Sequence, residues 1–206
     1  MKDGPPLLAA QDLSYATPDG RPLVRGLSFA VRRGEILAVT GPNGVGKSTL
    51  LKVILADARP SSGDFKFGGK SLSFLSQLHN REFHLPLRLS DVLAFNQSGR
   101  FDPARASRFG LLSEGEMELS WNTASGGERQ KTLLTQALLA DANLLVLDEP
   151  MNHLDTAARR KLIDVLLHLV QDGRQGVLMV CHEKTLLELD IASVKTLELS
   201  RYAHGC

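Results

Sequence analysis

Cysteine is almost absent from this sequence. Two occur among 206 residues, Cys181 inside an apolar run and Cys206 at the end of the chain. So few cysteines exclude a disulfide-rich scaffold, and their separation does not match the spacing of a metal site. We expect one buried thiol and one free thiol in the tail, as suits a reducing cytosol.

An excess of one charge and long apolar runs are missing too. Lys and Arg number 24 against 23 Asp and Glu, so the composition does not support a surface for nucleic acid or anionic lipid, and no nucleic-acid partner is expected. The longest apolar runs, LLVL and GVLMVC, are too short to span a bilayer, and the N-terminus lacks the apolar segment of a signal peptide. The sequence predicts a soluble protein that acts at a membrane only through another chain.

What the sequence does contain is an alternation of short strands and helices, separated by turn residues. The expected strands lie at about 8–15, 23–31, 35–40, 65–67, 71–75, 144–147, 177–181 and 194–199. The expected helices lie at about 47–56, 127–139 and 156–170. The strands at 144–147 and 177–181 are wholly apolar, which is typical of the middle of a parallel sheet and predicts an α/β fold. Gly68-Gly69 joins 65–67 to 71–75, as in a hairpin.

The stretch from about 78 to 119 breaks this alternation. Its pattern is helical but irregular, and it lacks the composition of a linker. We predict one domain over residues 1–206, with a mostly parallel sheet in a core at 1–77 and 140–206. The core begins with an antiparallel β subdomain, and a helical subdomain is inserted at 78–139.

A glycine-rich loop, GPNGVGKST, follows the strand at 35–40 and opens a helix, as the phosphate-binding P-loop does. Its glycines allow the backbone to curl around phosphate oxygens, and its N–H groups supply partial positive charge. Lys47 can reach the β- and γ-phosphates, and the Ser48 hydroxyl can ligate Mg²⁺. The predicted ATP-binding residues in this loop are Gly41, Pro42, Asn43, Gly44, Val45, Gly46, Lys47, Ser48 and Thr49.

Two carboxylates follow the apolar strand at 144–147. Ligands bind beyond the carboxyl ends of parallel strands, so Asp148 and Glu149 should emerge beside the P-loop. Side chains alternate along an extended segment, so the two acids should have different roles. Asp148 suits the Mg²⁺ shell, through water, and Glu149 suits the attacking water.

A second pair of glycines, in NTASGGERQ, opens the helix at 127–139. Helix N-termini with glycines bind anions, so one small chain carries two loops of this kind. The motifs GPNGVGKST, SGGERQ, LLVLDEP, NHLD and VCHE also occur in this order. In these motifs the chain resembles the nucleotide-binding subunits of ABC transporters, over about residues 7–200. The resemblance implies a P-loop NTPase core that hydrolyses ATP with Mg²⁺.

The resemblance also gives single residues a role. Tyr15 stands where the family stacks an aromatic ring on adenine, although an ordinary strand tyrosine is the alternative. Gln77 matches a glutamine that links the Mg²⁺ site to the helical subdomain, and His182 matches the histidine that contacts the γ-phosphate. The expected catalytic residues are Glu149, His182, Lys47 and Gln77, and the expected Mg²⁺ ligands are Ser48, Gln77 and Asp148.

In this family the second loop serves a partner subunit. The resemblance implies that Ser125, Gly126, Gly127 and Glu128 contact the γ-phosphate held by the other chain of a dimer, most simply a homodimer. Asp155 would meet the partner's phosphate site, and it also suits the N-cap of the helix at 156–170. His153 receives no role. The sequence departs from the family at Ala124, where leucine is usual, and at Cys181, where Thr or Ser is usual.

The resemblance implies a transport ATPase on the cytoplasmic face of the cell membrane. Multi-span permease subunits would dock at about 78–120. DEPMNHLD and LPLRLSDVLAF favour an importer of metal ion, metal chelate or vitamin B12, with a solute-binding protein in the system. An exporter ATPase and a soluble ABC ATPase that acts on ribosomes or DNA remain alternatives. A P-loop kinase or GTPase is disfavoured because neither needs SGGERQ and DEP at this spacing.

Overall fold

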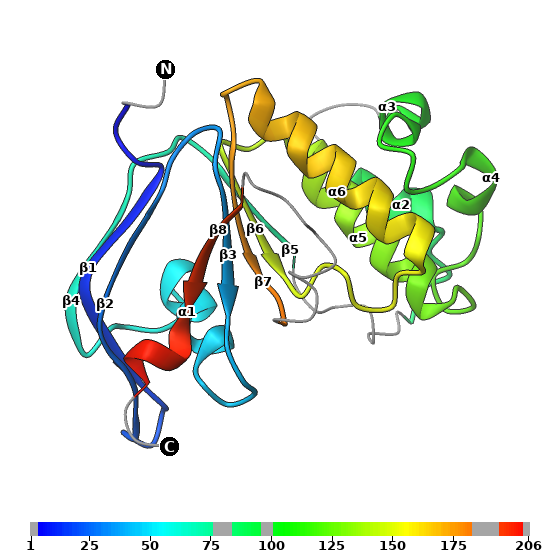
Figure 1. Cartoon of the computed structure of the whole chain (residues 1–206). Coiled ribbons are helices and arrows are strands. Elements are labelled where there is room, and N and C mark those ends of the chain that lie inside the picture. The colour runs from blue at the N-terminus through cyan, green and yellow to red at the C-terminus, as the bar shows by residue number, and fades with distance from the viewer. Residues whose placement is uncertain (1–3, 76–83, 96–100, 183–193, 204–206) are drawn as a thin grey trace.

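The computed structural model describes residues 4–75, 84–95, 101–182 and 194–203, so Gln77 and Cys206 lie outside the described residues. The described chain begins with three strands, and four helices follow one another in its middle (Figure 1). The elements are β1 (Leu8–Ala16), β2 (Pro22–Val31), β3 (Ile36–Thr40), α1 (Lys47–Ile54), β4 (Ser62–Phe67), β5 (Leu72–Leu75), α2 (Leu89–Ala94), α3 (Pro103–Ser107), α4 (Glu114–Met117), α5 (Gly126–Leu139), β6 (Leu144–Asp148), α6 (Thr156–Gln171), β7 (Gly176–Val180), β8 (Val194–Glu198) and the 3₁₀ helix η2 (Leu199–Tyr202).

The strands of the described ranges form two sheets. An antiparallel sheet has the order β2-β1-β4, and a parallel sheet has the order β5-β6-β7-β3-β8. This arrangement confirms the predicted α/β fold with an antiparallel β layer near the N-terminus. The hairpin expected around Gly68-Gly69 is wrong, because β4 and β5 belong to different sheets. The glycines carry the chain from one sheet to the other.

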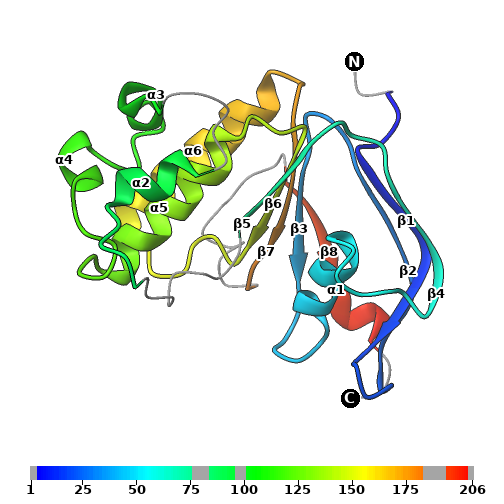
Figure 2. The same ribbon diagram turned by 180° about the vertical axis from the view of Figure 1, so that it is seen from behind.

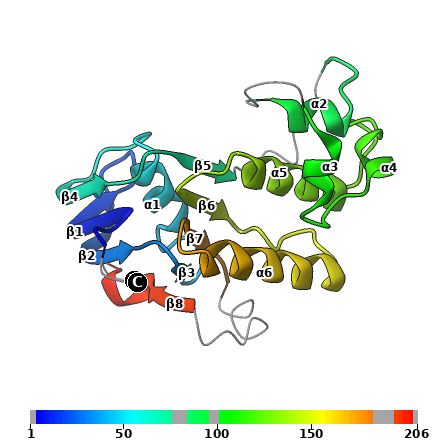
Figure 3. The same cartoon turned by 90° about the horizontal axis from the view of Figure 1, so that it is seen from above.

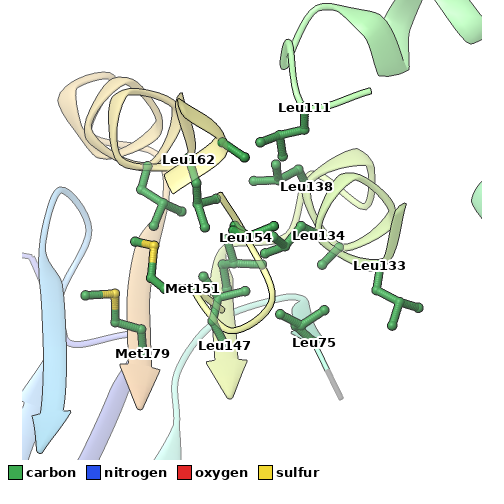
Figure 4. Close-up of a cluster of buried hydrophobic side chains, with 14 of the residues drawn as sticks. Leu75, Leu111, Leu133, Leu134, Leu138, Leu147, Met151, Leu154, Leu162 and Met179 are labelled. Carbon is green, nitrogen blue, oxygen red and sulfur yellow. The ribbon is translucent and has the colours of Figure 1, made fainter. Parts of the chain in front are cut away.

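The parallel sheet is buried on both faces, which explains its continuous apolar runs. Side chains of β6 alternate between two cores: Leu145 and Leu147 face one, and Leu144 and Val146 face the other. The first core lies under α5 and α6 and is drawn in Figure 4. The second lies between the two sheets and includes the apolar side of α1. Both layers thus hold β6 and its neighbours in place.

The short helices α2, α3 and α4 gather beyond α5, away from the sheets (Figures 2 and 3). They share a small apolar cluster with the end of α5. Its buried members are Leu93, Ala106, Leu112, Met117 and Leu139. This part of the chain is helical, as the sequence predicts for the insertion. The proposed subdomain boundary at residue 139 stays a prediction.

Parallel pairing brings three loops to one edge of the sheet. In the register, Val39 of β3 and Asp148 of β6 both pair with Val180 of β7. The chain therefore leaves these neighbouring strands at Gly41, Glu149 and Cys181 on the same side. The P-loop, the acidic pair and His182 are placed together by strand order alone, as expected for the carboxyl edge of an open α/β sheet.

Candidate functional site

The loop between β3 and α1 needs its glycines for conformation. Gly41, Gly44 and Gly46 have φ values of 146°, 81° and 108°, in the region that favours glycine. A Cβ on Gly41 would lie 2.9 Å from the Val45 side chain, and one on Gly46 would lie 3.1 Å from the Tyr15 ring. Side chains at these two positions would therefore push the loop off the structure beneath it.

Lys47 is folded back over this loop. Its side chain is buried, and its Nζ donates hydrogen bonds to the carbonyl oxygens of Gly41 at 2.6 Å and Pro42 at 3.1 Å. The ammonium group is thus held within the P-loop by two backbone carbonyl groups. A phosphate oxygen that enters the loop would meet a cation already held in place, so little side-chain entropy would be lost on binding.

A cavity of about 470 Å³ lies over the loop. Its lining comes from the P-loop, the β1–β2 turn, the start of β2 and Glu149: Thr17, Asp19, Arg21, Leu23, Asn43, Gly44, Gly46, Lys47, Ser48, Thr49 and Glu149. This volume lies within the usual range for a small-molecule site. Six of the nine predicted P-loop residues, and Glu149, therefore line one cavity. Thr17, Asp19 and Arg21 are lining residues that the sequence did not single out.

Tyr15 does not have the position expected of a residue that stacks on adenine. It is 1% exposed, belongs to the core between the two sheets and is not among the cavity's lining residues. Its ring supports Gly46 from below, so neither ring face is open to a base. Burial raises the pKa of the Tyr15 hydroxyl, which has no hydrogen-bond partner in the structure. The alternative, an ordinary strand tyrosine, describes this side chain better.

Asp148 ends β6 in a poorly solvated place. Burial and the neighbouring charge of Glu149 raise its pKa to about 6, and the positive charge of Lys47 acts in the opposite direction. An ionised Asp148 is therefore destabilised until more positive charge arrives. A hydroxyl and a carboxylate are oxygen donors that suit Mg²⁺, so Ser48 on the cavity wall and Asp148 fit the expected metal.

Glu149 directly follows Asp148 with a left-handed backbone, at φ 47°. Its N–H donates to the Val180 carbonyl at 2.9 Å, which ties the residue to β7. One carboxylate oxygen, Oε1, lies 3.3 Å from His182 Nε2, and the other, Oε2, accepts from Asn152 Nδ2 at 2.5 Å. The structure therefore brings Glu149 and His182 together, and it adds Asn152, a residue that sequence reasoning missed.

Cys181 confirms the expectation of a buried thiol. It is 3% exposed, and its N–H donates to the Val39 carbonyl at 3.1 Å. Burial raises its pKa to about 11, with Lys47 lowering the pKa and Glu149 raising it. A thiol with this pKa is protonated near neutrality, so Cys181 is a small apolar spacer rather than a nucleophile.

The second glycine loop starts α5 and is held by a capping box. The Ser125 Oγ accepts from the Glu128 N–H at 3.2 Å, and the Glu128 Oε2 accepts from the Ser125 N–H at 2.7 Å. Ser125 and Gly126 are exposed and do not line the P-loop cavity. A Cβ on Gly127 would lie 2.9 Å from the His153 carbonyl oxygen. The helix start thus faces solvent, packed against the loop that carries His153.

The turn before this loop is also fixed. Arg129 lies over the buried Trp121 ring at 5.6 Å and donates to the Trp121 carbonyl at 2.8 Å. Ala124 is buried in the core under α5. Asp155 caps α6 by accepting from the Ala158 N–H at 2.8 Å, as predicted, and is exposed. Its expected contact with a partner, like those of the second loop, stays a prediction.

Two negative findings apply to the described part of the chain. None of its helices combines the length and the apolar character that a bilayer crossing requires. Gln77, the expected link between the metal and the helical insertion, lies outside the described residues.

Comparisons with known proteins agree with this site. Residues 24–152 match the protein family described as "ABC transporter". The chain is 32% identical over 183 residues to the "Zinc import ATP-binding protein ZnuC" of Acinetobacter baylyi, covering 87% of this chain and 69% of that one. It is 33% identical to the "ABC transporter F family member 3" of Arabidopsis thaliana over 99% of this chain, but only 29% of that protein. The fold is similar to "An inward-facing conformation of a putative metal-chelate type ABC transporter", with a TM-score of 0.76 at 25% identity over 95% of this chain and 80% of that one.

Proposed function

The chain belongs to the ABC transporter ATP-binding family and is an ATPase, and from this premise we propose how its residues divide the work. The P-loop holds the triphosphate, with Lys47 on the β- and γ-phosphates. Ser48 and Asp148, the latter through water, would hold Mg²⁺, which when bound would neutralise charge on the phosphates. Arg21 and Leu23, on the cavity wall beside the P-loop, contact the base in place of Tyr15.

Glu149 is the general base in this proposal. It directly follows β6 and lines the cavity with the P-loop. There it accepts a proton from water as the water oxygen attacks the γ-phosphorus and ADP leaves. His182, whose Nε2 lies 3.3 Å from Glu149 Oε1, contacts the γ-phosphate. Replacing Glu149 with Gln is expected to keep ATP binding and lose most hydrolysis.

The second loop completes the site of a partner chain. The observation that carries this proposal is the position of Ser125 and Gly126, which are exposed and outside the P-loop cavity. A helix start with open N–H groups attracts phosphate oxygens, yet in this chain it does not face the chain's own P-loop. Two copies that exchange these surfaces would enclose two ATP molecules, each between one P-loop and one second loop.

Mixed dimers test this arrangement. A Lys47→Ala chain has an intact second loop, and a Gly126→Asp chain has an intact P-loop. Each variant alone should be inactive, whereas their mixture should recover one working site per heterodimer. Hydrolysis is measured at a fixed total concentration while the mixing ratio is varied. Absence of recovery, with heterodimers demonstrated by differently tagged chains, would count against a shared site.

For the whole system we propose import driven through a membrane permease. The support is the likeness to a zinc import ATPase and to a metal-chelate type transporter. Three large apolar side chains, Leu85, Phe95 and Leu119, are exposed in the region where the permease was expected to dock, by 67%, 47% and 38%. The permease would bind at these side chains, with this chain on the cytoplasmic side of the membrane. A solute-binding protein would deliver the metal ion, metal chelate or vitamin.

A soluble role away from membranes is the competing proposal. It is favoured by the 33% identity to an F family member, of whose length this chain matches only 29%. Fractionation of cells that express a tagged chain separates the two proposals. Association with a multi-span membrane protein supports transport, and association with ribosomes or DNA alone would overturn it.

A further inference from the structure

Asn152 lies in the turn between β6 and α6, three residues after Glu149. Its side-chain Nδ2 lies 2.5 Å from Glu149 Oε2. The other oxygen, Oε1, has His182 Nε2 at 3.3 Å. The carboxylate is therefore held on both sides by nitrogen atoms, one from the turn and one from the residue after Cys181.

The backbone of this turn keeps Asn152 in reach. The Glu149 carbonyl accepts from the Asn152 N–H at 3.1 Å, so the turn is closed by its own hydrogen bond. Met151 and Leu154 are 5% and 4% exposed and anchor the turn in the core under α5 and α6 (Figure 4). The Pro150 carbonyl accepts from the buried Gln130 Nε2 at 3.3 Å. The Asn152 side chain is thus attached to a rigid support rather than to a free loop.

We propose that Asn152 is a positioning residue for the catalytic base, an inference that rests on the role proposed above for Glu149. A carboxylate that takes a proton from water needs one oxygen aimed at the water, and the rotation of the carboxyl group must be restricted. The hydrogen bond from Asn152 engages Oε2, so the water is left to approach Oε1, on the side of His182. Without it, the carboxyl group samples rotamers that do not face the cavity.

A merely structural role for Asn152 makes different predictions. If it only closed the turn, its loss would lower stability and would slow any reaction in the site, including the residual hydrolysis of a protein without Glu149. If it acts through Glu149, its loss lowers kcat, leaves KM for ATP unchanged, and has no further effect once Glu149 is replaced.

The experiment uses the full chain and the variants Asn152→Leu and Asn152→Ser. Leucine has a similar size but no donor, and serine suits a turn but is too short to reach Oε2. The matched control is Gln175→Met, which removes the 3.0 Å bond from another side-chain amide to a carboxylate, that of Asp141. That bond lies before β6 and β7 begin, at the opposite end of these strands.

We expect both Asn152 variants to lose about 10- to 100-fold in kcat, the range for a hydrogen bond to a charged group, with KM within twofold of the original. The Gln175→Met variant keeps its kcat. In a Glu149→Gln background, adding Asn152→Leu leaves the residual single-turnover rate unchanged.

Each contrary result has one meaning. Near-original kcat in either Asn152 variant, or a loss of equal size in the Glu149→Gln background, overturns the positioning role. A changed KM with unchanged kcat overturns it as well. Near-original turnover by the Glu149→Gln variant alone would instead contradict the assignment of Glu149 as the base, which is the earlier proposal. Thermal melting of each variant shows whether a loss of folded protein explains a lost rate.

Discussion

The two glycine loops of this chain both present a helix N-terminus, but the first faces a cavity and the second faces solvent. In the first, Gly41–Thr49, the backbone curls around a buried lysine ammonium and faces a cavity of about 470 Å³. In the second, Ser125–Gly127, the first two residues are exposed and the nearby acid, Glu128, is used in the capping box. The first loop lines a cavity of its own chain, whereas in the proposed dimer the second loop serves the site of the partner.

The difference shows that anion-binding geometry alone does not tell whether a loop binds the nucleotide of its own chain or that of a partner chain. A helix N-terminus supplies partial positive charge in both loops. What separates them is whether a cation, a wall and a second loop of the same chain surround that terminus. The P-loop lines a cavity with a buried lysine, whereas Ser125 and Gly126 are exposed beside the loop that carries His153, which is why we proposed that a second chain covers them.

The largest effect on hydrolysis is expected from a substitution in the first loop. Lys47→Ala removes the cation held by the Gly41 and Pro42 carbonyls, and hydrolysis should fall by about 100- to 1000-fold, because loss of a desolvated charged contact removes about 3–4 kcal/mol. Steady-state ATPase assays measure this loss. Lys52→Ala, on an exposed face of the same helix, is the control and should keep its activity. Turnover within tenfold of the original would show that Lys47 is not the phosphate ligand.

The next largest effect on hydrolysis is expected from a substitution in the second loop that leaves the first loop intact. Gly126→Asp places a negative charge where the partner's γ-phosphate is expected, so hydrolysis should fall by about 100-fold. Binding of a fluorescent ATP analogue to the single chain should stay unchanged. Gly115→Asp in α4, with open space around the added Cβ, is the charge-matched control. A parallel loss of nucleotide binding would mean that the two loops serve one site within one chain.

A smaller effect concerns charge near the first loop. Burial raises the pKa of Asp148 to about 6, so the folded state holds its proton more tightly than the unfolded state does. Stability from this group is therefore full below about pH 4 and is lost as pH rises through about 6. In nucleotide-free protein, Asp148→Asn should raise the free energy of unfolding by about 1 kcal/mol at pH 7.5, after a discount for solvent screening.

The check for Asp148 is thermal melting at two pH values. The variant and the original should differ at pH 7.5 and converge near pH 4.5. Mg²⁺ with ATP should stabilise the original more than the variant, because the metal needs the carboxylate. Equal melting temperatures at pH 7.5 would mean that solvent already satisfies this group.

The smallest effect lies under the first loop. Tyr15→Phe removes a buried hydroxyl that has no hydrogen-bond partner in the structure, so stability should rise by about 0.5–1 kcal/mol. ATP affinity should not change, because the ring supports Gly46 rather than the base. Arg21→Ala on the cavity wall should instead weaken ATP binding with little effect on stability. Isothermal titration compares the two variants, and a Tyr15→Phe protein with weaker binding would restore the tyrosine to the nucleotide site.

Much of this architecture can be predicted from the sequence, for reasons that are local. Apolar runs such as 144–147 have to be buried on both sides, and the parallel sheet does this. The P-loop and the capping box of Ser125 are specified by residues that are neighbours in the chain. Strand order then places Asp148 and Glu149 beside the P-loop without further information.

The parts that the sequence did not predict depend on direction and on distant pairing. The alternating pattern of this strand predicts that every second side chain points into the protein. Only the packing of β1 on α1 decides that the Tyr15 ring lies beneath Gly46. Gly68-Gly69 allows a hairpin, and only the sheet assignment of β4 and β5 excludes it. Asn152 belongs to the NHLD motif, but the motif does not show that its side chain bonds to Glu149. That contact depends on the left-handed φ of Glu149, which turns the chain back on itself.

The bond between Gln130 and the Pro150 carbonyl has a mechanical consequence. It attaches the first half of α5, a helix of 14 residues and so about 21 Å long, to the peptide immediately after the proposed catalytic base, Glu149. A small tilt imposed at that attachment is enlarged at the far end, where α2 and α3 pack. Nine residues separate Gln130 from Leu139 at the end of α5, so a tilt set at this bond would be carried over about 14 Å by one continuous helix.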